Sequence, residues 1–260
     1  MISKDVIEAA AARLRDAQTQ GKPCEPVRTL IGETDIAAAY AVQQINNDLR
    51  VAQGGVVVGQ KIGLTSLAVQ KQLGVDQPDF GLLFADTEVK NGGSMKASAI
   101  LQPKAEAEIA FVMKHDLVGE ITESSAMEAI DYVVGAIEIV GSRVLNWDIK
   151  ITDTVADNAS ASHFVLGDIK RAAHEVDLAL VKMELLRNGT LASEGVGSAC
   201  LGSPLKALVW LAQTFADLGT PLRAGDLVLS GALGPMCAGE AGDTFQANIE
   251  GFGTVSFTFE

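Results

Sequence analysis

Two glutamates stand two residues apart inside an apolar stretch. Glu106 and Glu108 lie within "PKAEAEIAFVM" (103–113). In a β-strand, side chains two positions apart point to the same face, so these carboxylates project together with their Cβ atoms about 7 Å apart. A third glutamate, Glu138, lies within the equally apolar "VVGAIEIVGS". The pattern predicts a cluster of carboxylates carried by strands.

Carboxylates gathered inside a protein need a positive partner, because burying an ionised carboxylate alone is costly. A hard divalent cation such as Mg²⁺ or Mn²⁺ takes oxygen ligands and keeps positions open for water or substrate. We therefore predict a metal site on Glu106, Glu108 and Glu138. Spacing alone leaves another interpretation open, in which the first two glutamates face solvent and Glu138 pairs with Arg143. The apolar neighbours of Glu138 favour the metal.

Further polar residues stand beside glycines or turn residues. Lys61 in "GQKIG" could bind a carboxylate or act as an acid or base, or it could be a surface lysine in a turn. Asp79 in "QPDFG" and the pair Asn158 and Ser160 in "DNASAS" could line a site, or serve as ordinary turn and cap residues. Local sequence does not decide between these interpretations.

Composition narrows the class of ligand. The net charge of −13 disfavours binding to a nucleic-acid backbone and favours small molecules. If the substrate is an anion, a bound cation must offset the repulsion between the substrate and this acidic protein. The three histidines show no metal-ligand spacing, and the sequence has no nucleophile-elbow, P-loop or dinucleotide motif.

Three scattered cysteines without a paired motif predict reduced thiols and a cytoplasmic location. The first residues lack the pattern of a signal peptide, and no apolar run reaches the roughly 20 residues of a spanning helix, so we expect no membrane association.

The expected elements divide the chain near residue 56. Residues 1–55 form a helical N-terminal arm, and residues 56–260 form an α+β domain with a mostly antiparallel or mixed, curled sheet, because its strands do not alternate regularly with helices. The individual expectations are helices over 3–20 and from Thr34 to Gly54, a strand from Val56 ending in a turn around Lys61, a helix over 66–74, a strand over 105–113, a helix over about 124–134, a strand over 135–142, a hairpin around Asn188 and Gly189, a helix over 204–218, a strand over 225–233 and two closing strands within 244–260.

Six segments occur in a fixed order: "GQKIGLTS", "LGVDQPDFGLLFAD", "QPKAEAEIAFVM", "AIEIVGSR", "DTVADNASASHFVLG" and "LSGALGPM". Together they resemble the 2-keto-4-pentenoate hydratases (2-hydroxypenta-2,4-dienoate hydratases) of bacterial meta-cleavage pathways, within the fumarylacetoacetate hydrolase superfamily. The resemblance covers essentially the whole chain. It implies the mixed β-roll catalytic domain of that superfamily and a large homo-oligomer.

The resemblance also implies roles. Glu106, Glu108 and Glu138 match the family's Mg²⁺ or Mn²⁺ ligands, Lys61 and Asp79 match its acid/base candidates, and Ser160 matches a substrate contact. The implied substrate is a small anionic 2-hydroxy-dienoate. Water adds at C4 and a proton reaches C5, which gives 4-hydroxy-2-oxopentanoate. Association with other enzymes of the pathway is a further implication.

Related activities stay open as alternatives. A 4-oxalocrotonate decarboxylase resembles the chain in its metal ligands, but that enzyme typically lacks the aspartate that matches Asp79. A hydratase for a longer 2-oxo-enedioate would need an extra basic group in its pocket. A carbon–carbon hydrolase of the superfamily usually needs a histidine that activates water, and no histidine here lies in such a motif. A non-catalytic partner role is disfavoured by intact metal ligands.

Overall fold

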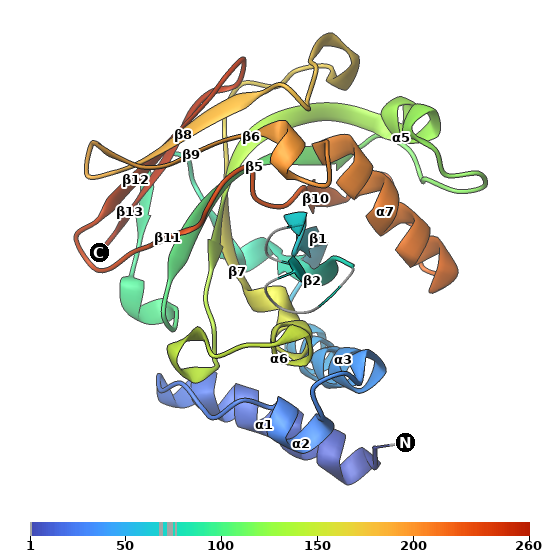
Figure 1. Cartoon of the computed structure of the whole chain (residues 1–260), viewed down its shortest axis with the longest axis vertical. Helices are drawn as coiled ribbons and strands as arrows, with labels where there is room; N and C mark the ends of the chain where they lie inside the picture. The colour runs from blue at the N-terminus through green and yellow to red at the C-terminus, as the bar shows by residue number, and fades with distance from the viewer. Residues whose placement is uncertain (1, 68–69, 72–74, 76) are drawn as a thin grey trace.

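The computed structural model describes residues 2–67, 70–71, 75 and 77–260. Figure 1 shows a group of helices below a curled arrangement of strands. The helices are α1 (Lys4–Gln20), α2 (Arg28–Ile31), α3 (Ile36–Ala52), α5 (Glu123–Ala129), α6 (Ile151–Ala156) and α7 (Pro204–Asp217). In the described part of the chain, no helix combines the length and apolar character needed to cross a membrane.

The N-terminal arm forms because its helices are capped and share an apolar face. Ser3 caps α1 by accepting a hydrogen bond from the backbone of Val6, and Gly21 ends the helix at φ 64°. Asp35 caps α3, one residue after the predicted Thr34. Alanines and larger apolar residues of α1–α3 pack with the segment around α6 in one buried cluster. The arm is therefore joined to α6 by an apolar interface as well as by the chain.

The larger sheet is mixed and has the order β2-β1-β10-β5-β6-β7-β3, with β11 paired to β5. Its parallel pairs are β1 with β10 and β3 with β7. The strands are β1 (Val57–Gly63), β2 (Asp79–Phe84), β3 (Glu88–Val89), β5 (Lys104–Met113), β6 (Ile130–Val140), β7 (Ala161–Leu166), β10 (Leu227–Leu229) and β11 (Cys237–Ala238).

A second sheet has the order β4-β13-β12-β8-β9. Its strands are β4 (Gly93–Met95), β8 (Lys182–Arg187), β9 (Thr190–Val196), β12 (Thr244–Ile249) and β13 (Gly253–Phe259). Buried residues of this sheet, of α7 and of one face of β5 and β6 form the main apolar core. This packing leaves the opposite face of β5 and β6 to line the inside of the curled sheet.

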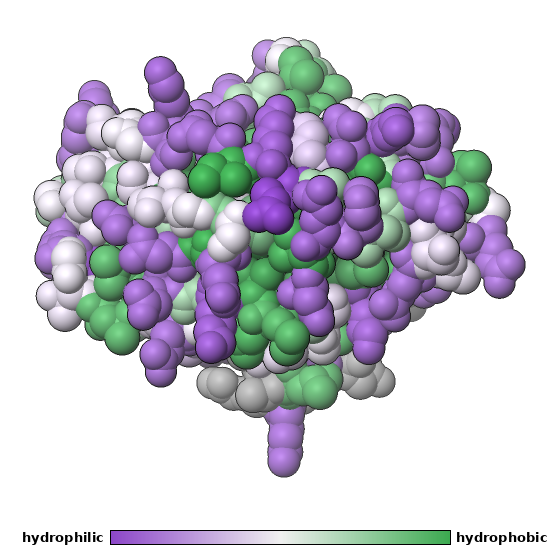
Figure 2. Space-filling model, turned by 90° about the horizontal axis from the view of Figure 1, so that it is seen from above, coloured by the Kyte–Doolittle hydropathy of each residue, from purple (hydrophilic) through white to green (hydrophobic). Residues whose placement is uncertain are grey.

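The two faces of β5 pack against different parts of the protein. Ala105, Ala107 and Ile109 point into the main core. Ala110, on the other face, joins a smaller apolar cluster on the inner face of the larger sheet. Strand alternation puts Glu106 and Glu108 on that same inner face. On the outside of the molecule, hydrophilic residues (purple) interrupt the hydrophobic ones (green) on the face drawn in Figure 2.

The predicted fold class, an α+β chain with a helical arm and a mixed curled sheet, is confirmed. The strand over 105–113, the hairpin around Asn188 and Gly189 and the helix over 204–218 are also confirmed. The helix expected over 66–74 falls largely outside the described residues. The division of the chain at residue 56 stays a prediction.

Three expectations about local structure were wrong. The helix expected over 124–134 ends at Ala129, because Tyr132, Val133 and Val134 suit a strand and pair with β5. The strand expected over 225–233 stops at Leu229, just before Gly231 at φ 95°. Lys61 does not lie in a turn but inside β1, between β2 and β10.

Candidate active site

Three glutamates come together on neighbouring strands. Glu106 of β5 lies directly opposite Glu138 of β6 in the antiparallel register, and Glu108 stands two residues further along β5. One carboxylate oxygen from each lies within 4.8 Å of the others. All three side chains are buried. The interpretation with solvent-facing glutamates is therefore wrong, and so is the pairing of Glu138 with Arg143, because Arg143 pairs with Asp157.

The carboxylate oxygens lack partners in a way that fits a metal. Within the described residues, Glu108 Oε1 and Glu138 Oε1 are buried without a hydrogen-bond partner, and the contact that Glu138 Oε2 makes is an ion pair with Lys61 Nζ at 3.2 Å. The backbone N–H of Gly231 donates to Glu108 Oε2 over 2.9 Å. Buried polar atoms are rarely left unpaired. Hard oxygen ligands converging from two strands suit Mg²⁺ or Mn²⁺, which would supply the missing contacts.

Electrostatics support the same conclusion. Burial raises the pKa of Glu108 well above its ordinary value, and the charges of Glu138 and Glu106 raise it further. Burial likewise raises the pKa of Glu138 to about 8, although the positive charge of Lys61 opposes the shift. Three carboxylates this close resist being ionised together. A divalent cation would let all three carry charge at neutral pH.

Lys61 supplies one positive charge to this cluster. Its Nζ lies 3.2 Å from Glu138 Oε2 and donates a hydrogen bond to the carbonyl of Ala159 over 2.9 Å. Burial alone would lower the pKa of Lys61, but the neighbouring carboxylates, led by Glu138, outweigh burial and raise it above the ordinary value. Lys61 is therefore held protonated, and the alternative of a surface lysine does not apply.

Asp79 lies at the start of β2, opposite Gly63 of β1. The hydroxyl of Thr154 donates to Asp79 Oδ2 over 3.2 Å, while Oδ1 has no partner among the described residues. Burial raises the pKa of Asp79, and the charge of Lys61 opposes that shift. A Cβ at Gly63 would lie 2.1 Å from Asp79 Oδ1 and 3.4 Å from Lys61 Nζ. Glycine therefore keeps open the space that these two groups border.

A strained turn carries Ser160 into the site. Asn158, Ala159 and Ser160 all have left-handed φ angles of 50–57°. Such angles are unfavourable for residues other than glycine, so surrounding contacts must hold them. The side chain of Asn158 does so by pairing with both the N–H and the carbonyl of Leu82 in β2, over 2.8 and 2.9 Å. The turn aims the carbonyl of Ala159 at Lys61, and the buried Ser160 hydroxyl has no hydrogen-bond partner in the part of the chain that the structure describes.

These groups border a cavity of about 350 Å³. Its polar end contains Lys61, Asp79, Glu106 and Ser160. Its remaining walls are largely apolar and include Ile62, Leu64, Val140, Trp147, Ile149, Ala199, Pro235 and Met236. Among the described residues that line the cavity, Lys61 is the one basic side chain. The shape suits a small anion with an apolar tail.

Sequence reasoning missed several residues of this cavity. Gly63, Thr154 and Trp147 all border it, and Gly231 binds Glu108 from a neighbouring loop. The glycines that flank Lys61 and the first glycine of "GALGPM" were noticeable, but no residue pattern singled out Thr154 or Trp147. The histidines stay outside: His115 and His174 are exposed.

The third histidine borders a different cavity. His163 lies beside a space of about 540 Å³ between the arm and the larger sheet. Its Nδ1 shares a hydrogen bond with the hydroxyl of Ser162 over 2.9 Å. It takes no part in the carboxylate site, so the water-activating histidine of a carbon–carbon hydrolase has no counterpart among the residues that line the site.

Comparison with known proteins agrees with this geometry. The family model of the fumarylacetoacetate (FAA) hydrolase C-terminal region matches residues 57–260. A 2-keto-4-pentenoate hydratase from Burkholderia vietnamiensis is 52% identical over 260 residues, which cover 100% of this chain and 99% of the relative. A 2-hydroxyhexa-2,4-dienoate hydratase from Comamonas testosteroni is 42% identical over 262 residues, covering 100% of this chain and 99% of that protein.

A solved structure resembles the whole chain as well. The 4-oxalocrotonate decarboxylase from Pseudomonas putida, complexed with magnesium and adipate, superimposes with a TM-score of 0.95 at 32% identity and covers 100% of this chain and 99% of its own. The likeness includes the N-terminal arm, which lies outside residues 57–260. The chain therefore belongs to the 2-keto-4-pentenoate hydratase family of the fumarylacetoacetate hydrolase superfamily, as its six ordered segments predicted.

Proposed function

We propose that this chain is a divalent-metal-dependent hydratase that converts 2-hydroxypenta-2,4-dienoate into 4-hydroxy-2-oxopentanoate. One observation carries the proposal. Three buried glutamates lie together, Glu108 and Glu138 each have an oxygen without a hydrogen-bond partner among the described residues, and Glu106 borders the polar end of a cavity whose other walls are largely apolar. Full-length relatives named as hydratases of such dienoates support it.

Glu106, Glu108 and Glu138 would hold the cation, and Mg²⁺ or Mn²⁺ fits their oxygen ligands. When bound, the cation supplies Lewis acidity beside the substrate's carboxylate and C2 oxygen and offsets their charge. The solved decarboxylase that resembles this chain was complexed with magnesium. Lys61 adds a fixed positive charge at the same end of the cavity.

Two proton movements accompany the addition of one water. The C2 hydroxyl loses its proton while C5 gains one, which gives an enone conjugated with the C2 carbonyl. The water oxygen then bonds to C4 as the water loses one proton, and C3 gains a proton. Lys61 is held protonated, and Asp79 has a carboxylate oxygen free of other partners. They border the open space at Gly63, so they are the groups placed to move these protons.

The apolar end of the cavity selects the substrate. The vinyl end of a five-carbon dienoate can lie against Trp147, Ile149 and Met236. A second carboxylate would need its own cation there. Among the described residues, Lys61 is the one basic residue of the lining, and Lys104 lies outside the lining with its Nζ 4.0 Å from the centroid of the Trp147 ring. This favours a monocarboxylate over the enedioate and the 4-oxalocrotonate alternatives.

The test is turnover by the purified chain. Decay of the dienol's ultraviolet absorbance is followed in protein stripped of metal by a chelator, and again after Mg²⁺ or Mn²⁺ is restored. We expect turnover only with metal, with 4-hydroxy-2-oxopentanoate as the product. Release of carbon dioxide, or turnover that persists in chelator, would overturn the proposal.

A homo-oligomer, a cytoplasmic location and association with other pathway enzymes stay predictions. Light scattering of the purified chain measures the first directly.

A further inference from the structure

The N-terminal arm packs against the segment 147–154, which forms one wall of the cavity. In Figure 1 the yellow α6 lies between the blue arm and the sheet. Val144, Ile151, Val155 and Ala156, which flank or belong to α6, pack into the same buried cluster as residues of α1, α2 and α3. The chain from Trp147 to Thr154 also lines the cavity through Trp147, Ile149 and Thr154. One segment thus faces the arm on one side and the substrate space on the other.

Arg28 of α2 fastens this segment at two points. Its guanidinium pairs with Asp148 Oδ2 over 2.7 Å and with Asp153 Oδ2 over 2.6 Å. It also donates to the backbone carbonyl of Asp148 over 2.5 Å, and the Arg28 N–H donates to Asp153 Oδ1 over 2.9 Å. The side chain of Asp153 is 0% exposed and that of Arg28 is 13% exposed. In this clamp the guanidinium bridges two carboxylates with charge-assisted hydrogen bonds, one to the buried Asp153 and one to Asp148, which is 66% exposed.

Each end of the clamp leads to the site within one residue. Asp153 also accepts the N–H of Lys150 over 2.9 Å, which fixes the start of α6. Thr154, next in the chain, donates to Asp79 Oδ2. At the other end Asp148 follows Trp147, whose indole N–H donates to the carbonyl of Gln102 over 3.0 Å. Through Arg28 the arm therefore contacts the neighbours of both Thr154, which donates a hydrogen bond to Asp79, and Trp147, which lines the cavity.

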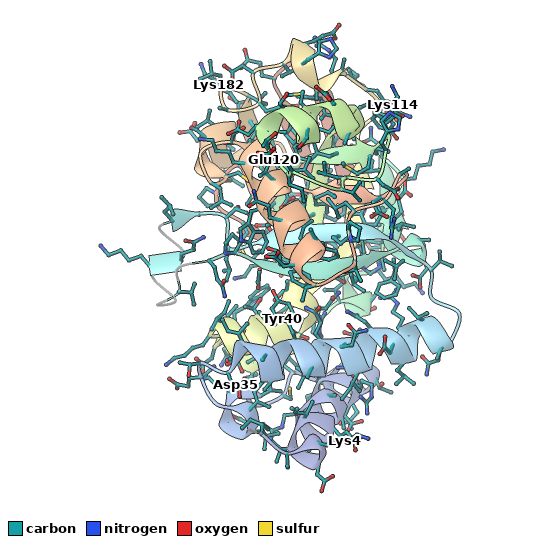
Figure 3. The ribbon with its side chains drawn as sticks, turned by 90° about the vertical axis from the view of Figure 1, so that its right-hand side faces the viewer. Lys4, Asp35, Tyr40, Lys114, Glu120 and Lys182 are labelled. Atoms are coloured by element: carbon teal, nitrogen blue, oxygen red, sulfur yellow. The ribbon has the colours of Figure 1, made fainter. Side chains whose placement is uncertain are left out.

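A second arm contact supports the first. The ring of Tyr40 in α3 stacks on Phe80, the residue after Asp79, with centroids 4.5 Å apart. Figure 3 shows Tyr40 on the side of α3 nearest the yellow α6. From the same helix, Gln43 donates to the carbonyls of Phe80 and Val155, both over 2.9 Å. Helix α3 thus ties the start of β2 to the end of α6.

We propose that Arg28 is a positioning residue for hydration: its clamp on Asp148 and Asp153 holds Thr154 against Asp79 and Trp147 against the apolar tail of the substrate. The inference rests on the proposed function. It assigns to the arm a task in the reaction, although Arg28 itself does not line the cavity. Misplacing a reacting group by a fraction of its contact distance costs rate more than binding, because binding uses the metal and the whole cavity.

The first test measures how accessible Trp147 is to a quencher and does not depend on turnover. The chain has two tryptophans, so Trp210→Phe leaves Trp147 as the single reporter. In that background we compare acrylamide quenching of Trp147 fluorescence in Arg28→Met, Arg28→Lys and Arg13→Met. Arg13 is the matched control, because it lies in the same arm and bonds to Pro26 and Thr29 rather than to Asp148 or Asp153. We expect quenching to rise about twofold in Arg28→Met, less in Arg28→Lys, and not at all in Arg13→Met.

The second test splits kcat from KM. Arg28→Met should lower kcat roughly tenfold or more while KM and Mn²⁺ affinity change less than about twofold. Asp148→Ala, which removes an exposed partner and leaves the buried pair intact, should give a smaller effect of the same kind. It also keeps the test decisive if Arg28→Met does not fold.

The outcomes separate the two proposals. Wild-type protein that does not hydrate the dienoate refutes the proposed function, whatever the quenching shows. Wild-type protein that does hydrate it, with Arg28→Met matching Arg13→Met in both quenching and kcat, overturns the positioning role. If Arg28→Met does not fold, unchanged quenching and kcat in Asp148→Ala overturn it instead.

Discussion

Lys61 and Glu138, 77 positions apart in the chain, form a buried ion pair in which Lys61 Nζ lies 3.2 Å from Glu138 Oε2. The pair joins the strand that carries the acid/base candidate to a strand of the carboxylate cluster. Lys61 therefore competes with a metal for the charge of Glu138. Its removal should affect turnover and metal binding in opposite directions.

Lys61→Met should lower kcat by about a thousandfold, the middle of the range for losing an acid/base group. The same variant should bind Mn²⁺ at least as tightly as wild type, because one positive charge has left the cluster. Isothermal titration of metal-stripped protein measures the affinity, and the dienol assay measures kcat. Loss of metal binding together with activity would show that Lys61 is needed to build the site rather than to move protons.

Glu108→Gln should have opposite effects on the metal-free and the metal-bound protein. Glutamine can still accept the N–H of Gly231, and it removes a carboxyl group whose ionisation is opposed by burial and by the neighbouring glutamates. Metal-free Glu108→Gln should therefore melt at or above the wild-type temperature. Saturating Mg²⁺, at about 100 times its Kd, should stabilise wild type by about 2.7 kcal/mol and the variant by much less.

Differential scanning calorimetry with and without Mg²⁺ checks that prediction. Glu184→Gln is the matched control, because Glu184 is an exposed glutamate on strand β8. It should leave the stabilisation by Mg²⁺ unchanged. An equal response in wild type and Glu108→Gln would remove Glu108 from the set of metal ligands.

The sequence was most informative about which side chains of a single strand share a face. Alternation alone put Glu106 and Glu108 on one face of their strand, as the structure has them. The apolar surroundings of Glu138 correctly indicated a buried carboxylate. The alternation of β5 and the caps of the helices are local properties, so short-range reasoning was sufficient.

What the sequence could not show depends on contacts between distant segments. Lys61 looked like a turn residue because its glycine neighbours suggest flexibility. Gly59 instead lets β1 approach β10, since a Cβ there would lie 1.8 Å from the carbonyl oxygen of Leu227. The left-handed turn at 158–160 exists because Asn158 pairs with β2, a contact 76 positions away in the chain. Thr154 and Trp147 border the cavity from a segment that packs against the N-terminal arm, and no local sequence pattern marks that placement.

Thr154→Val should move the pH profile of kcat. The Thr154 hydroxyl stabilises the charged form of Asp79, so its loss must raise the already elevated pKa of that carboxyl. A limb of the profile set by Asp79 therefore moves to higher pH, whether the reaction needs Asp79 charged or protonated. Thr152→Val is the control, because Thr152 is buried in the same helix and donates to the carbonyl of Gly32 instead. A shift of equal size in both variants would refute the assignment to Asp79.

The apolar end of the cavity predicts how the enzyme discriminates between mono- and dicarboxylates. A six-carbon 2-hydroxy-diene-dioate would place its second carboxylate near Trp147, Ile149 and Met236, away from Lys61. Lys104 Nζ lies 4.0 Å from the centroid of the Trp147 ring but is not part of the lining. Desolvating the second carboxylate without a basic residue in that part of the lining should cost about 3 kcal/mol, which lowers kcat/KM roughly a hundredfold relative to 2-hydroxypenta-2,4-dienoate. Ile149→Lys should narrow the gap by supplying a cation, while Ile149→Met should not. Competition between the two substrates, with each product quantified by mass spectrometry, measures the ratio. Equal kcat/KM for both substrates in the wild type would mean that charge at the distal wall does not set the choice of substrate.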